Sequence, residues 1–318
     1  MTYLLLLVGF ALLIKGADYF VEGASKIAQS LRVSPLLIGL TIVAFGTSAP
    51  EASVSFIAAF EGNSDVAIGN VVGSNIFNIT FILGVTALVF PLMVQSETIR
   101  KEIPFALLGA VALLLLISDI QLGSSATNLI TRTEGMMLLL FFAVFLYYIF
   151  EVARKDRRLT EENPPDIANV SKTKNTLLTI GGLAAIVFGG NLVVENSIQI
   201  ALSLGMSETL VGLTIVAVGT SLPELVTSIT AALKKQVDIA LGNIIGSNIF
   251  NIFFILGTSA AISPLTVDSK IFSDVWVMIA VSILLMILAR TKYKISRIEG
   301  SALAVIYIIY VIYIILRN

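Results

Sequence analysis

The feature that most constrains this chain is an internal duplication. Residues 39–84 read GLTIVAFGTSAPEASVSFIAAF, four further residues, then DVAIGNVVGSNIFNITFILG, and residues 212–257 repeat that stretch without a gap. About 29 of the 46 paired positions are identical at a constant offset of about 173 residues, which marks a duplicated structural unit. Each copy carries one acidic residue inside an apolar run, Glu51 and Glu224. We therefore expect two equivalent halves, with this pair of carboxylates at the working centre.

The composition places the chain in a membrane. Of its 318 residues, 57% are hydrophobic and 13% are charged, against about 25% charged residues in ordinary soluble domains, and the mean hydropathy is +0.96. Apolar runs long enough to cross about 30 Å of hydrocarbon occur at residues 2–24, 35–60, 66–91, 102–120, 133–153, 176–198, 208–233, 239–263, 272–290 and 298–316. The sequence predicts an all-α membrane protein with ten transmembrane helices.

Charge and residue usage exclude several classes of function. The net charge of −1 supplies no basic surface for nucleic acid. Because the chain has no Cys and no His, thiolate zinc sites, imidazole ligation and histidine acid–base catalysis are unavailable. Any cation site must therefore use oxygen ligands. We expect inorganic cations and the lipid bilayer as partners, no cofactor, and no obligate protein partner.

The distribution of basic residues predicts the topology. A polar segment at residues 154–175, with Pro164 and Pro165 in its middle, is interpreted as a flexible cytoplasmic linker between a first half (residues 1–153) and a second half (residues 176–318). With the amino terminus outside, the outer side keeps only Arg132, Lys270 and Arg317. The inner side then holds Lys26, Arg32, Arg100, Lys101, Arg154, Lys155, Arg157, Arg158, Lys172, Lys174, Lys234, Lys235, Arg290, Lys292, Lys294 and Arg297. This asymmetry predicts a multi-pass protein of the cytoplasmic membrane with both termini extracytoplasmic.

An odd number of spans per half inverts the second copy relative to the first. Inverted repeats are related by a pseudo-twofold axis in the membrane plane, and equivalent residues meet near the midplane. Glu51 and Glu224 are equivalent and lie well inside their spans. We expect them to face each other across that axis.

The segment around each Glu predicts a break in the second and seventh spans. It reads AFGTSAPE from Ala44 to Glu51 and AVGTSLPE from Ala217 to Glu224. Gly weakens a helix, and Pro lacks an N–H and disfavours helical geometry at the preceding residue. Carbonyls freed at membrane depth are tolerated only where they line a cavity or bind something. Thr47 and Ser48, with Thr220 and Ser221 in the second copy, add hydroxyls near the carboxylates.

The second segment of each copy supplies further oxygens. Ser74 and Asn78 are four residues apart, as are Ser247 and Asn251, so each pair lies on one helical face. Carboxylate, hydroxyl, amide and carbonyl oxygens are the ligands of hard cations such as Ca²⁺ and Na⁺. The alternative is structural, with each Glu capped by hydroxyls that hold helices together and each hydroxyl bonded back to the preceding turn.

Two acidic residues begin the third and eighth spans, Asp65 and Asp238. Helix N-caps favour Asp, so we interpret both as caps. The alternative is that they line the approach of a cation to the site.

The paired motifs resemble a known family. GTSAPE with GNVVGSNIFN, repeated as GTSLPE with GNIIGSNIFN, is similar to the alpha-repeats of the Ca²⁺/cation antiporter superfamily, in its sodium/calcium exchanger branch of prokaryotic type. The resemblance implies two inverted five-helix units with four ion sites between spans 2, 3, 7 and 8, and spans 1 and 6 that slide past this core. As ligands it implies Glu51 and Glu224, surrounded by Thr47, Ser48, the Ala44 carbonyl, Thr220, Ser221, the Ala217 carbonyl, Ser74, Asn78 and Ser247.

The leading hypothesis is therefore a Na⁺/Ca²⁺ antiporter. Proton-coupled relatives tend to carry an acidic residue and His after the Gly-Asn pair, which this chain lacks. Many exchangers place Asp where Asn251 stands, so this site has two carboxylates and its coupling ion stays open. The alternatives are H⁺- or K⁺-linked exchange of Ca²⁺ or Mn²⁺, and a passive cation channel. An intramembrane hydrolase using Ser48 or Ser221 lacks an activating base, so no enzyme activity is expected.

Overall fold

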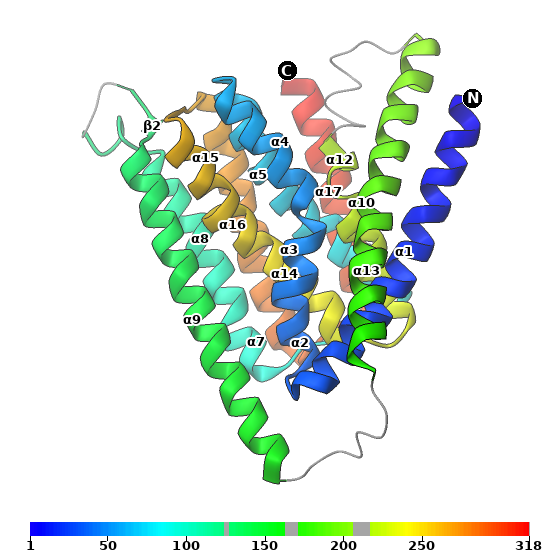
Figure 1. Cartoon of the computed structure of the whole chain (residues 1–318). Helices are drawn as coiled ribbons and strands as arrows, with labels where there is room; N and C mark the ends of the chain where they lie inside the picture. The colour runs from blue at the N-terminus through cyan, green and yellow to red at the C-terminus, as the bar shows by residue number, and fades with distance from the viewer. Residues whose placement is uncertain (124–126, 163–170, 206–216, 318) are drawn as a thin grey trace.

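The computed structural model describes residues 1–123, 127–162, 171–205 and 217–317 (Figure 1). Nearly all of this described chain is helical. Two short antiparallel strand pairs join distant segments, β1 (Leu92–Met93) with β4 (Lys294–Ile295) and β2 (Leu129–Ile130) with β3 (Leu265–Thr266). The expectation of an all-α membrane protein is confirmed in this form.

The helices follow the predicted apolar runs in order. In the first half they are α1 (Thr2–Leu31), α2 (Pro35–Ile38), the π-helical η1 (Gly39–Val43), α3 (Ala44–Thr47), α4 (Ala49–Phe60), α5 (Ser64–Phe77), the π-helical η2 (Asn78–Ile82), α6 (Leu83–Val89), α7 (Ser96–Arg100), α8 (Glu102–Leu116) and α9 (Arg132–Glu162). In the second half they are α10 (Lys172–Ser203), α12 (Ala217–Gly219), α13 (Leu222–Leu233), α14 (Val237–Phe250), the π-helical η4 (Asn251–Leu256), α15 (Gly257–Ile262), α16 (Ser269–Lys292) and α17 (Arg297–Arg317).

Seven continuous helices in the described ranges are long and apolar enough to cross a membrane, and an eighth span is formed if the bent segment from Pro35 to Phe60 counts as one. The remaining two predicted runs are represented by shorter helices. Helix α8 has 15 residues and α13 has 12. Residues 208–216, the predicted start of the seventh span, lie outside the described part of the chain.

The predicted linker is partly helical, which corrects its expected boundary. Helix α9 continues to Glu162, and α10 begins at Lys172. Arg, Lys and Glu are good helix formers, so the charged residues after Ala153 extend the helix beyond the apolar run, and the two prolines come only at residues 164 and 165. Residues 163–170 lie outside the described ranges.

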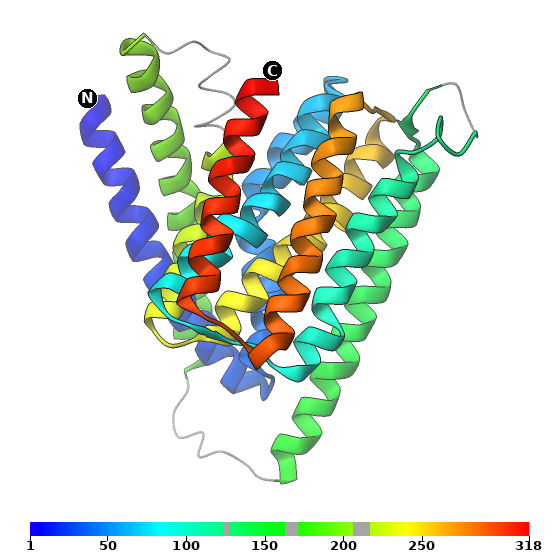
Figure 2. The same ribbon diagram turned by 180° about the vertical axis from the view of Figure 1, so that it is seen from behind.

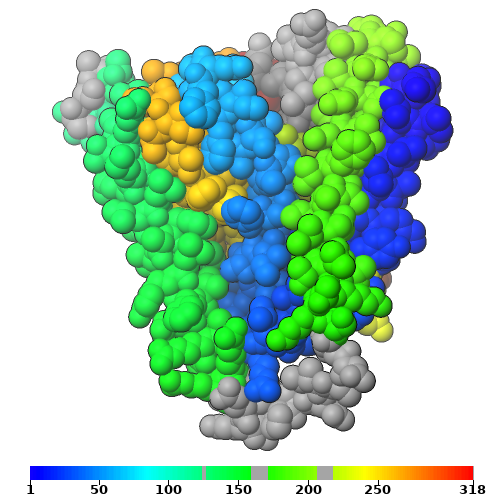
Figure 3. Space-filling view, viewed as in Figure 1, coloured from blue at the N-terminus to red at the C-terminus, as the bar shows by residue number. Residues whose placement is uncertain are grey.

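The two duplicated segments form the centre of the molecule. In Ser64–Val89 and Val237–Ile262 the most apolar stretch is 78% and 94% buried, whereas in Arg132–Arg158 it is 11% buried. Those two central elements carry four of the predicted ligands. Ser74 and Asn78 lie on α5 and η2, and Ser247 and Asn251 lie on α14 and η4. Segment Pro35–Phe60 lies beside them and is exposed along one face between α9 and α10 (Figure 3). The outer helices thus shield the repeats, and the repeats hold the candidate site.

Helices α1 and α10 lie side by side at one flank, as both ribbon views show (Figures 1 and 2). Their close approach requires glycine, because a Cβ on Gly16 or Gly182 would lie 2.9 Å or less from backbone of the opposite helix. Leu13, Phe20 and Ile186 belong to a hydrophobic cluster separate from the main core. The same cluster also contains Ile38, Val43, Ala231, Ile239 and Ala240, so the pair packs against the repeats through a cluster separate from the main core.

Equivalent parts of the two halves make reciprocal contacts. Strand β1 pairs with β4 while its equivalent β3, about 173 residues later, pairs with β2. Likewise Gly84 packs against Gly300 and its equivalent Gly257 packs against Gly135. The two strand pairs lie at opposite ends of the molecule, and both termini lie at the end that carries β2 (Figure 1). Helix α9 ends, and α10 begins, at the other end.

Equivalent glycines nevertheless differ in their surroundings. A Cβ added to Gly242 would lie 2.6 Å from the Leu36 carbonyl oxygen and 2.8 Å from the Leu40 nitrogen. For its counterpart Gly69, no atom of the described residues lies within 4 Å of the added Cβ, and the positions equivalent to Leu36 and Leu40 fall in 206–216, outside the described ranges. Gly246 is likewise packed against Leu40 and Ala44, whereas no described atom lies near a Cβ added to Gly73. Within the described ranges, the second repeat is therefore packed against the second span, and the first repeat has no equivalent contact.

This difference predicts opposite effects of the same substitution. Gly242→Ala should lower the free energy of unfolding by about 1–3 kcal/mol, because the methyl group meets backbone that cannot move aside. Gly69→Ala should raise it by about 0.5–1 kcal/mol, because Ala is the better helix former and nothing obstructs its side chain. Thermal unfolding of both purified variants in the same detergent measures this, and equal destabilisation of the two would contradict the packing.

Candidate cation site

The second span bends next to its carboxylate. Ser48 lies between α3 and α4 with φ −80° and ψ 9°, and the two segments it separates are bent by 49°. Its counterpart Ser221 precedes α13 with φ −90° and ψ 9°. Pro50 and Pro223 lie in the first turn of the following helix, where a missing N–H costs nothing. Each bend thus places Glu51 or Glu224 in the first turn of a helix.

Hydrogen bonds cross between the two repeats at these bends. The Ser48 hydroxyl donates to Glu224 Oε1 at 2.8 Å, and the Ser221 hydroxyl donates to Glu51 Oε1 at 2.8 Å. Ser48 Oγ lies 3.0 Å from Ser247 Oγ, and Ser221 Oγ lies 3.2 Å from Ser74 Oγ. Six of the predicted site residues therefore form two equivalent groups of three, each joining the two repeats.

A second layer of amides joins the two central elements. Asn78 Nδ2 donates to Asn248 Oδ1 at 3.1 Å, and Asn251 Nδ2 donates to Asn75 Oδ1 at 3.0 Å. All four side chains are buried. Asn78 and Asn251 each begin a π-helical segment, a distortion that occurs frequently at functional sites. The amide nitrogens are thus used inside the protein, while the oxygens of Asn78 and Asn251 remain available.

The cluster concentrates buried oxygens without a hydrogen-bond partner. Ten buried side-chain nitrogen or oxygen atoms in the described residues lack such a partner, and five belong to predicted site residues. These five are Glu51 Oε2, Glu224 Oε2, Asn78 Oδ1, Asn251 Oδ1 and Thr220 Oγ1. Because a buried polar atom without a partner costs about 1–3 kcal/mol, their concentration here requires an explanation.

The two carboxylates also lack a compensating positive charge. Glu51 is 1% exposed and Glu224 is 0% exposed. No ion pair recorded among the described residues involves either of them. Burying a charge is costly unless it is paired or coordinates a cation. Two adjacent carboxylates in this state favour a bound cation over a purely structural role.

The remaining predicted residues are placed less directly. The Thr47 hydroxyl donates to Asn243 Oδ1 at 2.9 Å and lies 3.4 Å from the Ala44 carbonyl oxygen. That carbonyl also accepts the Ser48 N–H at 3.0 Å, so it is held in the helix. Ala217 begins α12, and its side chain lies outside the described part of the structure. The proton of the Thr47 hydroxyl is therefore used in the hydrogen bond to Asn243, and its contact with the preceding turn is the longer of the two.

Two asparagines missed by sequence reasoning support the carboxylates. Asn70 Nδ2 donates to the Glu51 carbonyl at 3.1 Å, and Asn243 Nδ2 donates to the Glu224 carbonyl at 3.3 Å. Each also binds a serine hydroxyl at 2.9 Å. Their repetition in both copies, like that of Asn75 and Asn248, is the sequence signal that could have identified them. They fix the backbone from which each Glu extends.

The prediction that Asp65 and Asp238 cap their helices is wrong. Asn63 precedes α5, and its side chain accepts the Val66 N–H, so Asp65 lies inside the first turn. Asp238 also lies inside the first turn of α14, and it accepts a hydrogen bond from Gln95 at 3.0 Å. An acidic residue in the first turn still interacts favourably with the helix dipole.

The available ligands define the chemistry. Nowhere in the described ranges do three or more His, Cys, Asp or Glu side chains gather into a metal-binding group. The candidate site has two carboxylates, and every other donor is a neutral oxygen. Such a set suits Ca²⁺ or Na⁺, which prefer hard oxygen ligands, over softer transition metals.

Comparison with known proteins gives a consistent result. The family model described as "Sodium/calcium exchanger protein" matches residues 1–151 and 174–316. The chain is 36% identical over 337 residues to the sodium/calcium exchanger MaX1 of Methanosarcina acetivorans, covering 96% of each chain. It is 39% identical over 291 residues to the inner membrane protein YrbG of Escherichia coli, covering 89% of this chain and 87% of YrbG.

The fold is also similar to a solved structure. The structure of the sodium-calcium exchanger NCX_Mj soaked with Na⁺ and Sr²⁺ superposes with a TM-score of 0.83 and 32% sequence identity. The match covers 97% of this chain and 98% of that one.

The two threonines provide a test of the site. Thr220→Val removes a hydroxyl that has no partner among the described residues, so the free energy of unfolding without divalent cation should change by less than about 0.5 kcal/mol. Thr47→Val leaves Asn243 Oδ1 buried without its donor and should cost about 1–3 kcal/mol. The stabilisation that added Ca²⁺ produces should shrink in Thr220→Val. Denaturation with and without Ca²⁺ measures both effects, and a Thr220 variant as unstable as the Thr47 variant would contradict this geometry.

Proposed function

This chain belongs to the sodium/calcium exchanger protein family, and we propose that it exchanges Ca²⁺ for Na⁺ across the cytoplasmic membrane at the buried oxygen cluster centred on Glu51 and Glu224. The observation that carries this proposal is that each carboxylate has one oxygen without a protein partner. Both ions are transported substrates, and the proposed mechanism uses no cofactor and no enzymatic step.

Charge balance supports Ca²⁺ as one of the substrates. Two ionised carboxylates neutralise one divalent cation, so the loaded site carries little net charge past apolar barriers. Ca²⁺ takes six to eight oxygens at about 2.3–2.6 Å. The oxygens of Glu51, Glu224, Asn78, Asn251 and Thr220 that lack partners supply most of that number.

The same charge balance explains why the protein exchanges cations and does not let them leak across the membrane. Without a cation the site carries about two negative charges, which are very costly in a low-dielectric barrier. The protein therefore changes conformation only after counter-ions refill the site. If three Na⁺ replace one Ca²⁺, one positive charge moves with them, which is worth about 2.3 kcal/mol per 100 mV.

We also propose the inverted ten-span arrangement with both termini extracytoplasmic. The reciprocal strand pairs at opposite ends of the molecule support the inversion. Both termini lie at one end, while the basic residues at the end of α9 and the start of α10 lie at the other (Figure 1). The positive-inside rule makes that second end cytoplasmic.

The unequal glycines support alternating access. Gly69 and Gly73 line a cavity and have no described atom near an added Cβ, whereas Gly242 and Gly246 are packed against the segment from Leu36 to Ala44. In an inverted repeat, the opposite state exchanges these two environments. The separately packed pair α1–α10 is the element that slides between the two states. Each cation then reaches the site from one side at a time.

The counter-ion is the least constrained part of the proposal. Asn78 and Asn251 are both amides, so the site has no third carboxylate that a further cation or a proton could use. The runner-up function is H⁺- or K⁺-coupled exchange of Ca²⁺ or Mn²⁺, and a passive channel is the third. Flux measurements separate all three.

Proteoliposomes provide the direct test. An outward Na⁺ gradient should drive ⁴⁵Ca²⁺ uptake, and Glu51→Gln or Glu224→Gln should abolish it, because each removes one of the two charges that balance Ca²⁺. Glu61→Gln is the matched control, because Glu61 is exposed in the turn after α4. Uptake that follows a pH or K⁺ gradient and ignores Na⁺ would replace Na⁺ as the counter-ion. Ca²⁺ conductance that needs no counter-ion would exclude an antiporter.

Alternating access predicts a transport defect in a stable protein. Gly69→Ala should fold well but slow exchange by about tenfold or more, because a clash of at least 1.4 kcal/mol would arise only in the opposite state. Gly181→Ala, also with no atom near the added Cβ, should exchange at the wild-type rate. The same ⁴⁵Ca²⁺ assay measures both variants. If Gly69→Ala transported Ca²⁺ at the wild-type rate, this would contradict the proposal that the two pairs of glycines swap surroundings between the two states.

A further inference from the structure

A cavity of about 660 Å³ leads to the candidate site from the end of the molecule that carries both termini. Helices α4, α5, α16 and α17 contribute its walls. Ser74 and Thr220, both predicted site residues, lie in its lining. So do Asp65, Asp268, Lys270, Asp274 and Arg317. The cavity thus joins a group of charged side chains to the two hydroxyls at the site.

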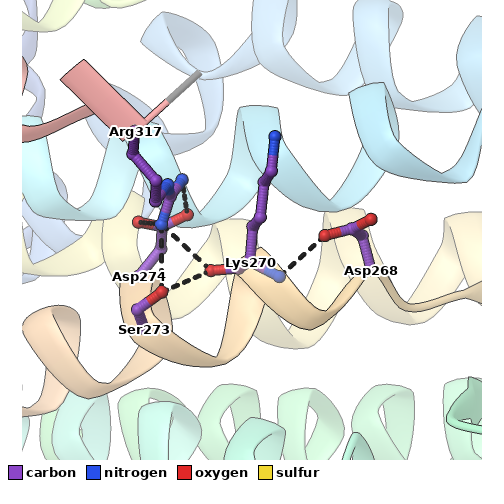
Figure 4. A network of polar contacts seen from close by, with 5 residues as sticks. All are labelled: Asp268, Lys270, Ser273, Asp274 and Arg317. Carbon is purple, nitrogen blue, oxygen red and sulfur yellow. Dashed lines mark hydrogen bonds and ion pairs between the residues drawn. The ribbon is translucent and has the colours of Figure 1, made fainter. Parts of the chain in front are cut away.

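The carboxyl-terminal end of α17 is fixed to α16 within this lining (Figure 4). Arg317 donates from Nη1 to Asp274 Oδ1 at 3.0 Å and from Nη2 to Asp274 Oδ2 at 2.9 Å. Nη1 also donates to Ser273 Oγ at 3.0 Å and to the Lys270 carbonyl at 3.1 Å. Asp274 is only 7% exposed. Bidentate pairs of this kind are the strong, geometrically specific ones.

The charges of the Arg317–Asp274 pair lie in the cavity lining, together with other charged side chains. The cavity lining contains three carboxylates, Asp65, Asp268 and Asp274, and two basic groups, Lys270 and Arg317. Asp268 accepts the Lys270 backbone N–H at 2.7 Å and caps α16, so its position is fixed. The guanidinium of Arg317 neutralises Asp274. The strength of the local potential therefore depends on whether Arg317 holds its charge beside that carboxylate.

We propose that the Arg317–Asp274 pair sets the electrostatic potential of this cavity and thereby determines how strongly hydrated divalent cations are concentrated in front of the site. The inference rests on the proposed function, because it treats the cavity as the entry path of the transported cations. Removal of Arg317 exposes the charge of Asp274 to the cavity. Removal of Asp274 leaves Arg317 as an uncompensated positive charge.

The size of the effect follows from Coulomb's law. One unit charge at about 8 Å in a water-like dielectric changes the local concentration of a divalent cation about fivefold and that of a monovalent cation about twofold. Salt screens the interaction, because the Debye length falls to about 3 Å at 1 M ionic strength. The pair therefore acts more strongly on Ca²⁺ than on Na⁺, and only at low to moderate ionic strength.

The chain has no Cys, which allows a test that needs no transport. Val311→Cys places one thiol in the cavity lining. Its rates of modification by the cationic trimethylammonium-ethyl and the anionic sulfonato-ethyl methanethiosulfonates report the local potential as a ratio. Arg317→Gln should raise this cation-to-anion ratio about fivefold or more, and Asp274→Asn should lower it by a similar factor. Both changes should collapse at 1 M salt.

Three variants separate a charge effect from a mechanical one. The double variant Arg317→Gln/Asp274→Asn leaves no unpaired buried charge and should return the ratio to within about twofold of wild type. Arg317→Lys keeps the charge and should leave it unchanged. A thiol at Leu122, 65% exposed and absent from the cavity lining, should show no dependence on Arg317. Equal ratios in all backgrounds, or shifts in one direction for both single variants, would overturn the proposal.

A transport measurement distinguishes this inference from the proposed function. In proteoliposomes, Arg317→Gln should lower the KM for Ca²⁺ on the cavity side about fivefold and Asp274→Asn should raise it, with kcat preserved. Wild-type exchange with unchanged KM in both variants would refute the inference alone. Absence of Na⁺-driven exchange in wild type would refute the proposed function, while the thiol ratios would still decide the role of the pair.

Discussion

Two carboxylates buried inside a membrane protein without a basic partner are the constraint on which the structure depends. Glu51 and Glu224 are almost completely buried, and each keeps one oxygen without a hydrogen bond. Serine hydroxyls satisfy the other two oxygens across the interface between the repeats. The asparagines Asn70 and Asn243 hold the backbone beneath each carboxylate. Among the described residues, the carboxylate oxygens left without a partner are the ones proposed to bind the cation.

The duplication places equivalent residues on both sides of the candidate site. The two copies nevertheless differ in their surroundings. Reciprocal contacts place the same residue types on both sides of one point, so a single motif supplies both walls of the site. A symmetric protein would leave both approaches equal. Among the described residues, Gly242 is packed against the second span, whereas Gly69 lines the cavity that reaches Ser74 and Thr220. The same sequence motif therefore occupies two environments in one conformation.

The sequence predicted the class of fold and the residues of the candidate site because both leave local signals. Apolar runs identify helices, and a repeated GTSxPE motif identifies the bends at Ser48 and Ser221. Other features depend on contacts between distant segments. The pairing of Asn78 with Asn248, the turning of Thr47 toward Asn243, and the ion pair between Arg317 and Asp274 join residues far apart in sequence. Asp65 lies where the sequence pattern predicts a helix cap, but Asn63 accepts the capping hydrogen bond from the Val66 N–H. The charged residues after Ala153 resembled a linker, yet they favour helix until a proline intervenes.

The central claim is that one divalent cation binds directly between the two repeats. Anomalous diffraction from crystals of the protein grown with Sr²⁺ or Mn²⁺ in place of Ca²⁺ tests it most directly. Direct binding between the repeats predicts one divalent peak in contact with Glu51 Oε2 and Glu224 Oε2, at distances near the roughly 2.3–2.6 Å of Ca²⁺–oxygen bonds. Divalent peaks found only elsewhere, with both carboxylates hydrogen-bonded to protein groups alone, would contradict it.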